Sequence, residues 1–209
     1  MKLPENFKKR VSMTTVGVIL CAIAVGFFKC SQFGVDPFQC FAQGVWGRFF
    51  SAKADYGIYY TILSGILLLV DWFIARSYMG AATLVNMFLT GYIVDFTSEV
   101  IMHFSPEPTL LTRIVFLAVA VLVMCFASSL YMTSNLGVSV YDAIPIVIAE
   151  KRNLPFKFVR IGCDLLCVII GALSGLLPGI GTLITAFFMG PLIAFFNHNF
   201  SEPFLAKGK

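Results

Sequence analysis

Two short stretches decide the fold of this chain: FGVDPF at residues 33–38 and LGVSVY at residues 136–141. Each is followed by a second motif, GAATLV at residues 80–85 in the first case and GIGTLI at residues 179–184 in the second. Two motifs that recur in the same order at similar spacing indicate an internal duplication. The sequence therefore predicts two structural repeats.

Each repeat contains three long apolar stretches and a short one. A transmembrane helix needs about 20 mostly apolar residues. Six stretches qualify: residues 11–29, 56–75, 79–101, 111–132, 155–177 and 179–197. Residues 36–50 and 139–150 are too short as helices to cross a hydrocarbon layer about 30 Å thick. We expect an all-α membrane protein with six transmembrane helices and two short half-helices.

The number of spans in each repeat sets the relation between the two copies. The first repeat covers residues 11–104 and the second covers residues 111–200, within a single membrane domain of residues 1–209. Three spans is an odd number, so the second copy enters the membrane in the opposite orientation. We therefore expect an inverted repeat with two-fold pseudosymmetry.

The composition agrees with a membrane protein. Hydrophobic residues make up 58% of the chain and charged residues 12%, against roughly 45–50% and about 25% in soluble domains. The net charge of +4 does not indicate nucleic-acid binding, because the basic residues lie between the apolar stretches and orient membrane helices. Lys8, Lys9 and Arg10 precede the apolar run at residues 11–28, which places the N-terminus in the cytoplasm.

The topology has two readings that differ at the short helices. Six spans follow from segment length, whereas the distribution of basic residues over the loops leans toward eight short spans. Both readings place both termini in the cytoplasm. We adopt the six-span reading because length is the stronger constraint.

Motifs for catalysis or metal binding are missing from the sequence. It contains no HExxH, GxSxG or P-loop pattern, and none of the six cysteines forms a CxxC pair. Most cysteines lie inside apolar runs, where they behave as small buried hydrophobes. We expect free thiols, no cofactor, no metal site and no enzymatic activity.

The two short helices begin in similar ways. In the first, Asp36 is a good N-cap, Pro37 occupies the first helical position and Gln39 completes a capping box. In the second, Ser139 takes the cap position and Asp142 matches Gln39.

A glycine precedes each of these caps. Gly34 and Gly137 are expected to make sharp turns with positive φ, which glycine adopts without steric cost. Ordinary helix punctuation would account for these residues in a soluble protein.

In a membrane the same features predict a binding site. Half-helix N-termini that converge at mid-depth in inverted repeats are a recurrent transporter site, and their amides favour an anionic group. The carboxylates at Asp36 and Asp142 offset this potential, so a zwitterion or cation stays open. The candidate solute-binding residues are Gly34, Asp36, Gln39, Asn86, Gly137, Ser139, Tyr141 and Asp142.

Ionisable residues inside spans are costly and commonly functional. Asp95, Arg160 and Asp164 are the candidates for a coupling ion or proton. Arg160 and Asp164 are four residues apart and can form a pair within one helix. Asp71 lies near a helix end, where we expect it to reach water.

A family resemblance appears at the glycine motifs. LGVSVYDA at residues 136–143, PGIGTL at 178–183 and GPLI at 190–193 resemble the YczE/YyaS/YitT family of bacterial membrane proteins. In the first repeat Gln39 stands where the second repeat has Asp142, and Met79 stands where the second repeat has Pro178. The resemblance implies the bacterial cytoplasmic membrane and says little about a substrate.

Together these features predict a small secondary transporter that moves a small polar or anionic solute by alternating access. One alternative is a non-transporting solute-binding subunit that needs an energy-coupling partner, and another is an embedded lipid-handling protein. The expected partners are the solute and membrane lipids, with no nucleic acid. The sequence leaves a monomer and a homodimer open.

Overall fold

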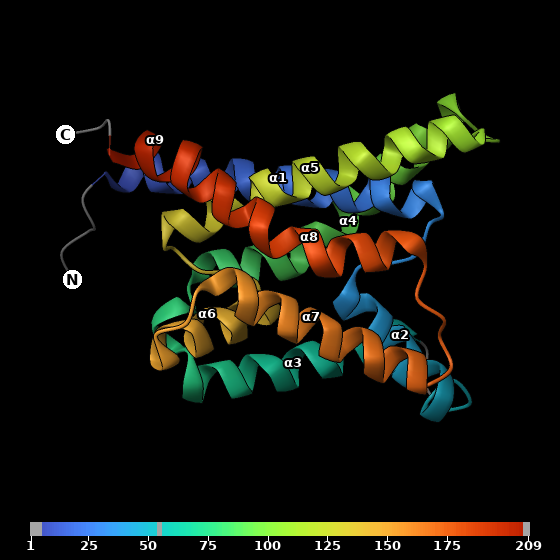
Figure 1. The fold of residues 1–209 in the computed structure, drawn as a ribbon, viewed down its shortest axis with the longest axis horizontal. Helices are drawn as coiled ribbons and strands as arrows, with labels where there is room; N and C mark the ends of the chain where they lie inside the picture. The colour runs from blue at the N-terminus through green and yellow to red at the C-terminus, as the bar shows by residue number, and fades with distance from the viewer. Residues whose placement is uncertain (1–5, 54–55, 207–209) are drawn as a thin grey trace. The chain divides into compact units, whose positions relative to one another are not determined.

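The computed structural model describes residues 6–53 and 56–206 of the chain. Within these ranges the side chains of residues 56–57, 77, 81–82, 84–92 and 95 are outside the description. Every regular element in the described part is helical (Figure 1), which confirms the all-α prediction there.

The order of the helices repeats along the chain. The first half contains α1 Phe7–Ser31, α2 Pro37–Phe49, α3 Tyr56–Ile74 and α4 Ala81–Phe104. The second half contains α5 Leu110–Ser134, α6 Val140–Arg152, α7 Phe156–Leu173 and α8 Ile180–Phe196. A 3₁₀ turn η1 (Arg76–Tyr78), a π-helical turn η2 (Asn197–Ser201) and α9 (Glu202–Ala206) complete the set. Both predicted short helices are helices of 13 residues.

Three helical segments in the described residues are long and apolar enough to cross a membrane: Phe7–Ser31, Leu110–Ser134 and Ile180–Ala206. Ile58–Ile74 is a shorter apolar helix. α7 has a suitable length of 18 residues but carries three charged side chains, Lys157, Arg160 and Asp164. By length and composition the described residues therefore contain three candidate spans, and the six-span arrangement stays a prediction.

The chain forms two compact units, and each unit takes helices from both halves of the sequence. Unit 1 contains residues 1–31, 77–139 and 191–209, and unit 2 contains residues 32–76 and 140–190. The two units are described separately below.

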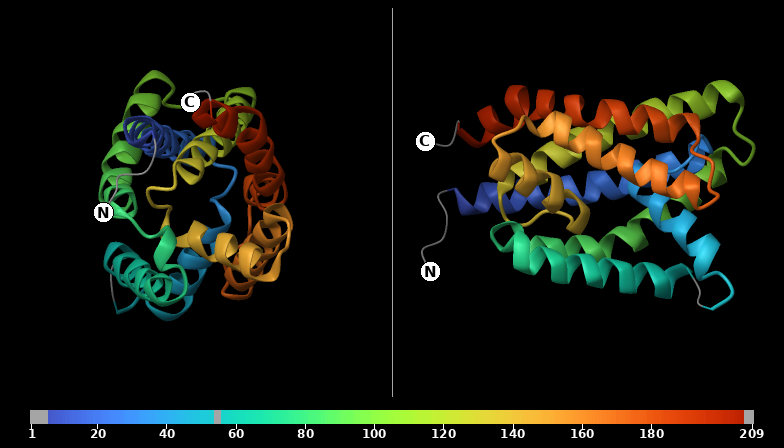
Figure 2. Two further views of the ribbon diagram at one scale, coloured as in Figure 1. Left: turned by 90° about the vertical axis from the view of Figure 1, so that its left-hand side faces the viewer. Right: turned by 60° about the horizontal axis from the view of Figure 1, so that its bottom comes forward.

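Small residues allow the helices of unit 1 to pack closely. α1 packs along α5 and α4 (Figures 1 and 2). A Cβ atom on Gly17 of α1 would lie 2.9 Å from the carbonyl oxygen of Ala127 in α5, and Ala22, Ala24 and Ala120 are fully buried. Close approach at small residues is the usual basis of helix packing in membranes, where lipid competes with apolar side chains.

The π-helical turn η2 packs against α5 in the same unit. Thr133 Oγ1 donates a hydrogen bond to Asn197 Oδ1 at 3.3 Å, and the hydroxyls of Ser129 and Ser201 are bonded to each other. The ring of Phe126 contacts Phe196 edge-on at 5.5 Å between centroids. These contacts fix the C-terminal segment to α5.

In unit 2, α7 packs against the two short helices α2 and α6, and α3 also contacts both of them. The crossing of α2 and α7 is close, because a Cβ atom on Gly44 would lie 2.7 Å from the carbonyl oxygen of Gly171. A Cβ atom on Gly171 would lie 2.6 Å from the carbonyl oxygen of Cys40. Two glycines thus bring the α2 backbone directly onto α7.

Candidate functional site

The turn before α2 has the predicted positive φ and packs on the start of α8. Gly34 has φ of +121°. A Cβ atom there would lie 2.6 Å from Thr182 Oγ1 and 3.0 Å from the Cα of Gly179. Thr182 Oγ1 also accepts a hydrogen bond from the Val35 amide at 3.1 Å and donates one to the Val35 carbonyl at 2.5 Å. We call this contact of residues 33–35 with residues 179–182 the α2 junction.

Unit 1 contains a matching contact before α6. Gly137 has φ of +129°. A Cβ atom there would lie 2.8 Å from Thr83 Oγ1 and 3.0 Å from the amide nitrogen of Gly80. The amide of Val138 donates to the carbonyl of Tyr78 at 3.1 Å. We call this contact of residues 136–138 with residues 78–83 the α6 junction.

The two junctions have matching glycine contacts, and both join the two halves of the chain. Gly34 of the first half meets Gly179 of the second, whereas Gly137 of the second half meets Gly80 of the first. A Cβ atom on Gly179 or Gly80 would lie 2.0 Å from the carbonyl oxygen of residue 33 or residue 136, respectively. The turn motif of each half therefore contacts the second glycine motif of the other half, and the backbone that approaches each turn glycine belongs to the protein itself.

The predicted start of α2 is confirmed. Asp36 is the N-cap, its carboxylate accepts a hydrogen bond from the Gln39 amide at 3.0 Å, and Pro37 occupies the first turn. Ser139 directly precedes α6, and Asp142 lies in the first turn of that helix.

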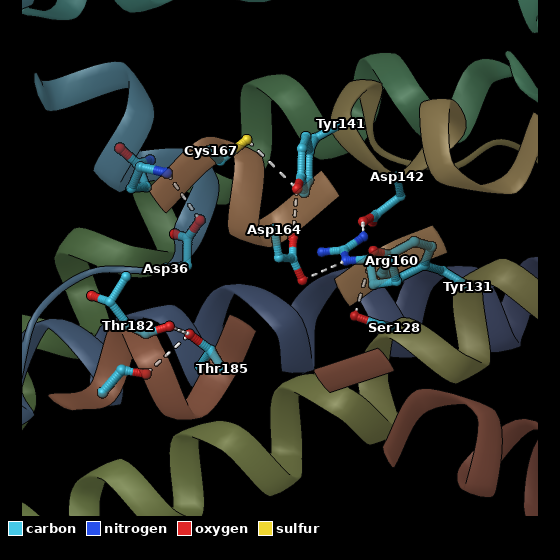
Figure 3. Close-up of polar contacts among 12 residues, drawn as sticks. Asp36, Ser128, Tyr131, Tyr141, Asp142, Arg160, Asp164, Cys167, Thr182 and Thr185 are labelled. Atoms are coloured by element: carbon cyan, nitrogen blue, oxygen red, sulfur yellow. Dashed lines mark hydrogen bonds and ion pairs between the residues drawn. The ribbon is translucent and has the colours of Figure 1, made fainter. Parts of the chain in front are cut away.

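A buried ionic cluster joins α6 to α7 (Figure 3). Arg160 Nε donates to Asp164 Oδ2 at 3.1 Å, and Arg160 Nη1 donates to Asp142 Oδ1. Tyr141 Oη donates to Asp164 Oδ1 at 2.5 Å. Arg160, Asp142 and Asp164 are 4%, 5% and 0% exposed. We call these four residues the Arg160 cluster.

Aromatic rings border the Arg160 cluster. The Tyr141 ring stacks on Phe38 of α2 with 4.9 Å between centroids, and the Arg160 guanidinium lies 4.7 Å from the Tyr141 centroid. Phe38 also contacts Tyr60 of α3 at 6.1 Å. Cys167 Sγ donates a weak bond to Tyr141 Oη at 3.7 Å. The cluster thus lies on α6 and α7 and contacts α2 through Phe38, which in turn contacts α3.

Asp36 is a third carboxylate within electrostatic reach of this cluster. Its charge interacts with those of Asp164 and Arg160, and its side chain is half-buried. The charge of Asp36 also interacts with the hydroxyl group of Tyr60. Asp36 therefore adds a carboxylate beside the N-terminus of a short helix to the two carboxylates and the guanidinium of the Arg160 cluster.

The predicted site residues divide between the two units. Unit 2 brings together Asp36, Tyr141, Asp142, Arg160 and Asp164, with Gly34 and Gln39 at the start of α2 in the same unit. Gly137 and Ser139 belong to unit 1. The side chains of Asn86 and Asp95 lie outside the described residues.

The structure corrects the expectation for Asp71. We expected this residue to reach water from a helix end, but it is 1% exposed. Its neighbours Trp72, Phe73 and Ile74 are all exposed. Asp71 therefore lies on the one face of the last turns of α3 that packs against protein.

Several contact residues of the site were missed by sequence reasoning. Thr182 and Thr83 entered the sequence analysis only as members of the repeated motifs at residues 179–184 and 80–85. Their shared position, three residues after a glycine, was the available signal for a common role. Phe38, Tyr60 and Cys167 carry no signal of their own, because apolar and aromatic residues occur throughout a membrane helix. All six cysteines are free thiols, as predicted.

The helical fold, the apolar helices and the buried ionic cluster define a helical membrane protein. Residues 8–198 match the model of a protein family described as a family of unknown function, DUF6198, and the chain belongs to this family.

Three relatives support the assignment. The chain is 24% identical over 188 residues to an uncharacterized protein of Haemophilus influenzae, covering 90% of this chain and 83% of the relative. It is 23% identical over 180 residues to the uncharacterized membrane protein YczE of Bacillus subtilis, covering 86% and 81%. It is 20% identical over 194 residues to the uncharacterized protein YyaS of Bacillus subtilis, covering 93% and 95%.

These relatives confirm the resemblance to YczE and YyaS that the glycine motifs indicated. No solved structure matches the chain.

Proposed function

We propose that this protein is a small secondary transporter of the bacterial cytoplasmic membrane that exchanges protons for, or moves them with, a small polar or anionic solute. The observation that carries the proposal is the Arg160 cluster, in which a buried guanidinium bonds two buried carboxylates. Ionisable groups inside membrane helices are costly and commonly mark ion or substrate pathways. The protein has no catalytic role in this proposal.

The charges of the cluster suit reversible protonation. Arg160 contributes one positive charge, whereas Asp142 and Asp164 contribute two negative charges when both are ionised. A buried excess of charge is expensive in a low-dielectric environment. One proton on either carboxyl would balance the three groups, so we expect the cluster to bind a proton during the transport cycle.

The two bonds of Arg160 are not equivalent. The bond to Asp164 lies within α7, so a movement of α6 does not by itself separate its two partners. The bond to Asp142 crosses from α6 to α7, so protonation of Asp142 would weaken the contact between two helices. The freed Nη1 donors could then bind a carboxylate or phosphate group of the solute, which guanidinium recognises well. This order of events links proton binding to solute binding.

The two junctions support an inverted repeat as the framework for alternating access. In each junction the turn glycine of one half of the chain contacts a glycine and a threonine of the other half. The residues that make these contacts occupy equivalent positions in the two repeats. Two-fold related copies would produce this pattern. In this proposal six helices span the membrane, α2 and α6 are half-helices, and both termini lie in the cytoplasm.

The test uses the purified protein in two assays. A thermal-shift screen against anionic and zwitterionic metabolites identifies a ligand, since a ligand that binds the folded state raises its stability. The protein is then reconstituted into liposomes that contain no ATPase, and uptake of this ligand is measured with and without a pH gradient.

We expect uptake that the pH gradient drives. Binding without any uptake would contradict transport and favour the solute-binding subunit. Uptake at the same rate with and without the pH gradient would contradict proton coupling at the cluster. An ordered lipid headgroup bound at Arg160 would favour lipid handling instead.

A further inference from the structure

A further buried carboxylate in unit 2 stands apart from the two in the Arg160 cluster. Asp71 of α3 is 1% exposed, and its Oδ2 atom has no hydrogen-bond partner among the described residues. Such an oxygen is rare in a folded protein, because a buried polar atom that has lost its bonds to water without gaining a partner destabilises the fold, and a charged one does so more strongly. Something other than the described side chains must satisfy it.

The helical spacing places Asp71 on the polar face of α3. Ser64 is 3% exposed and lies two turns earlier on the same face. Ser64 bonds the hydroxyl of Tyr60, whose ring contacts Phe38 beside the Arg160 cluster. Eleven residues separate Tyr60 from Asp71, which is about 16 Å along a helix. Asp71 is thus a separate site on a helix that also reaches the cluster.

The charged groups around Asp71 do not offer it a partner. α3 packs against α2 and α6. On these helices Arg48, Glu150, Lys151 and Arg152 are exposed at the helix ends. Tyr141 and Asp142 of α6 are bonded to residues of α7, and Cys40 of α2 is a buried thiol. None of these described groups forms a hydrogen bond with Asp71 Oδ2.

The surroundings decide which ligand fits. A divalent metal needs several oxygen, nitrogen or sulfur ligands, and among the described residues no group of three His, Cys, Asp or Glu side chains is placed to hold a metal ion. A proton needs one oxygen and no additional space. Its binding forms an O–H bond, removes the negative charge and leaves a neutral acid, which is far cheaper to bury than a carboxylate.

We propose that Asp71 is a proton-binding site of the folded protein. The proton comes from water and returns to water, and no other reactant takes part. Its participation in transport as a second proton site, beside the Arg160 cluster, rests on the proposed function, whereas the binding of the proton does not. The two ideas can therefore fail independently.

Infrared spectroscopy of the purified full-length protein tests this proposal directly, without any solute. The protein is placed in ether-linked lipid, which lacks the ester carbonyl that would overlap with the carbonyl band of a protonated carboxylic acid. Spectra are recorded in H₂O and D₂O across a neutral pH series. The variants are Asp71→Asn and the control Glu150→Gln, an exposed acid on α6.

We expect one deuterium-sensitive carboxylic-acid band that Asp71→Asn removes and Glu150→Gln leaves unchanged. If Asp71→Asn does not fold, Asp71→Glu in protein labelled with ¹³C-aspartate should move the band from the labelled to the unlabelled position. Spectra of wild type that lack such a band would overturn the proposal. So would a band that appears only after sodium is removed, because sodium would then be the resident ligand.

Discussion

Arg160 bonds its two carboxylates through different nitrogens, Nε and Nη1, while its plane lies over the Tyr141 ring. A lysine has one ammonium on a flexible chain and cannot reproduce this planar arrangement. We expect Arg160→Lys to lower the stability of the protein by about 1.5–3 kcal/mol, the usual range for a hydrogen bond to a charged group. Thermal unfolding in detergent measures the loss.

Lys157→Arg is the matched control for this substitution. Lys157 is exposed on the same helix, one turn before Arg160. Replacing lysine by arginine at this exposed position should leave the unfolding temperature unchanged. An equal effect at both positions would mean that the bonds of Arg160 contribute nothing specific.

Asp142 offers a test of function rather than of stability. Asp142→Asn keeps the shape of the side chain but cannot be protonated and deprotonated. Arg160 retains Asp164 in this variant, so we expect the protein to fold. Binding of the solute should persist, whereas uptake should no longer depend on pH. The measurement is uptake over a pH series at matched protein levels, and identical curves for both proteins would reduce Asp142 to a structural partner of Arg160.

Single residues show how far the sequence could predict the site. The pair of Arg160 with Asp164 followed from a spacing of four residues on one helix. The participation of Asp142 depends on how α6 and α7 cross, which no local pattern specifies. The prediction for Asp71 was wrong for a similar reason. Distance from a helix end says nothing about which face of the helix packs against protein.

At the scale of elements, the α2 junction makes glycine necessary at position 34. Gly34→Ala would force a side chain into positive φ, which costs about 1–2 kcal/mol, and the Cβ atom would meet Thr182 Oγ1 at 2.6 Å. Overpacking adds about 1–3 kcal/mol. Thermal unfolding should show a clear loss of stability. Gly47→Ala, in a helix with no atom within 4 Å of the new Cβ, should be neutral or slightly stabilising.

The hydroxyl of Thr182 closes the same junction. Thr182→Val keeps the volume of the side chain but leaves the Val35 amide and carbonyl without their partner. We expect a loss of about 1–3 kcal/mol in unfolding free energy. Thr182→Ser retains the hydroxyl and should recover most of it. If valine and serine variants unfold at the same temperature, the two hydrogen bonds do not stabilise the junction.

The positions of the helices were easier to predict than their contacts. Apolar runs, the Asp36 cap and the two turn glycines located α1 to α8 to within a few residues, whereas η1, η2 and α9 were not predicted. The contact of Gly34 with Gly179 could not be predicted. Sequence similarity between two motifs shows that they are equivalent, but it does not show which motifs contact each other. The packing of α2 on α7 through Gly44 and Gly171 had no repeat signal at all.

At the scale of the whole molecule, the number of spans decides on which side of the membrane the α2–α3 loop lies. In the six-span arrangement residue 53 faces outward, whereas in the eight-span arrangement it faces the cytoplasm. We expect a single cysteine at position 53, on a Cys-free background, to react with an impermeant thiol reagent added outside intact cells. A cysteine at position 151 is the control, since both arrangements place it inside. Labelling of position 53 from the cytoplasmic side alone would contradict six spans.

The crossed junctions also bear on how the protein is made. The hydrogen bonds between Val35 and Thr182 join residues 147 positions apart. A ribosome releases the first half of the chain long before Thr182 emerges, so α2 must wait in the translocon or the lipid without its partner. Large sequence separation makes such contacts slow to form. Neither half, produced alone, contains a complete junction. Two half-length genes expressed together should therefore restore a folded protein that neither yields by itself, and proteolysis in the cell should remove each orphan half.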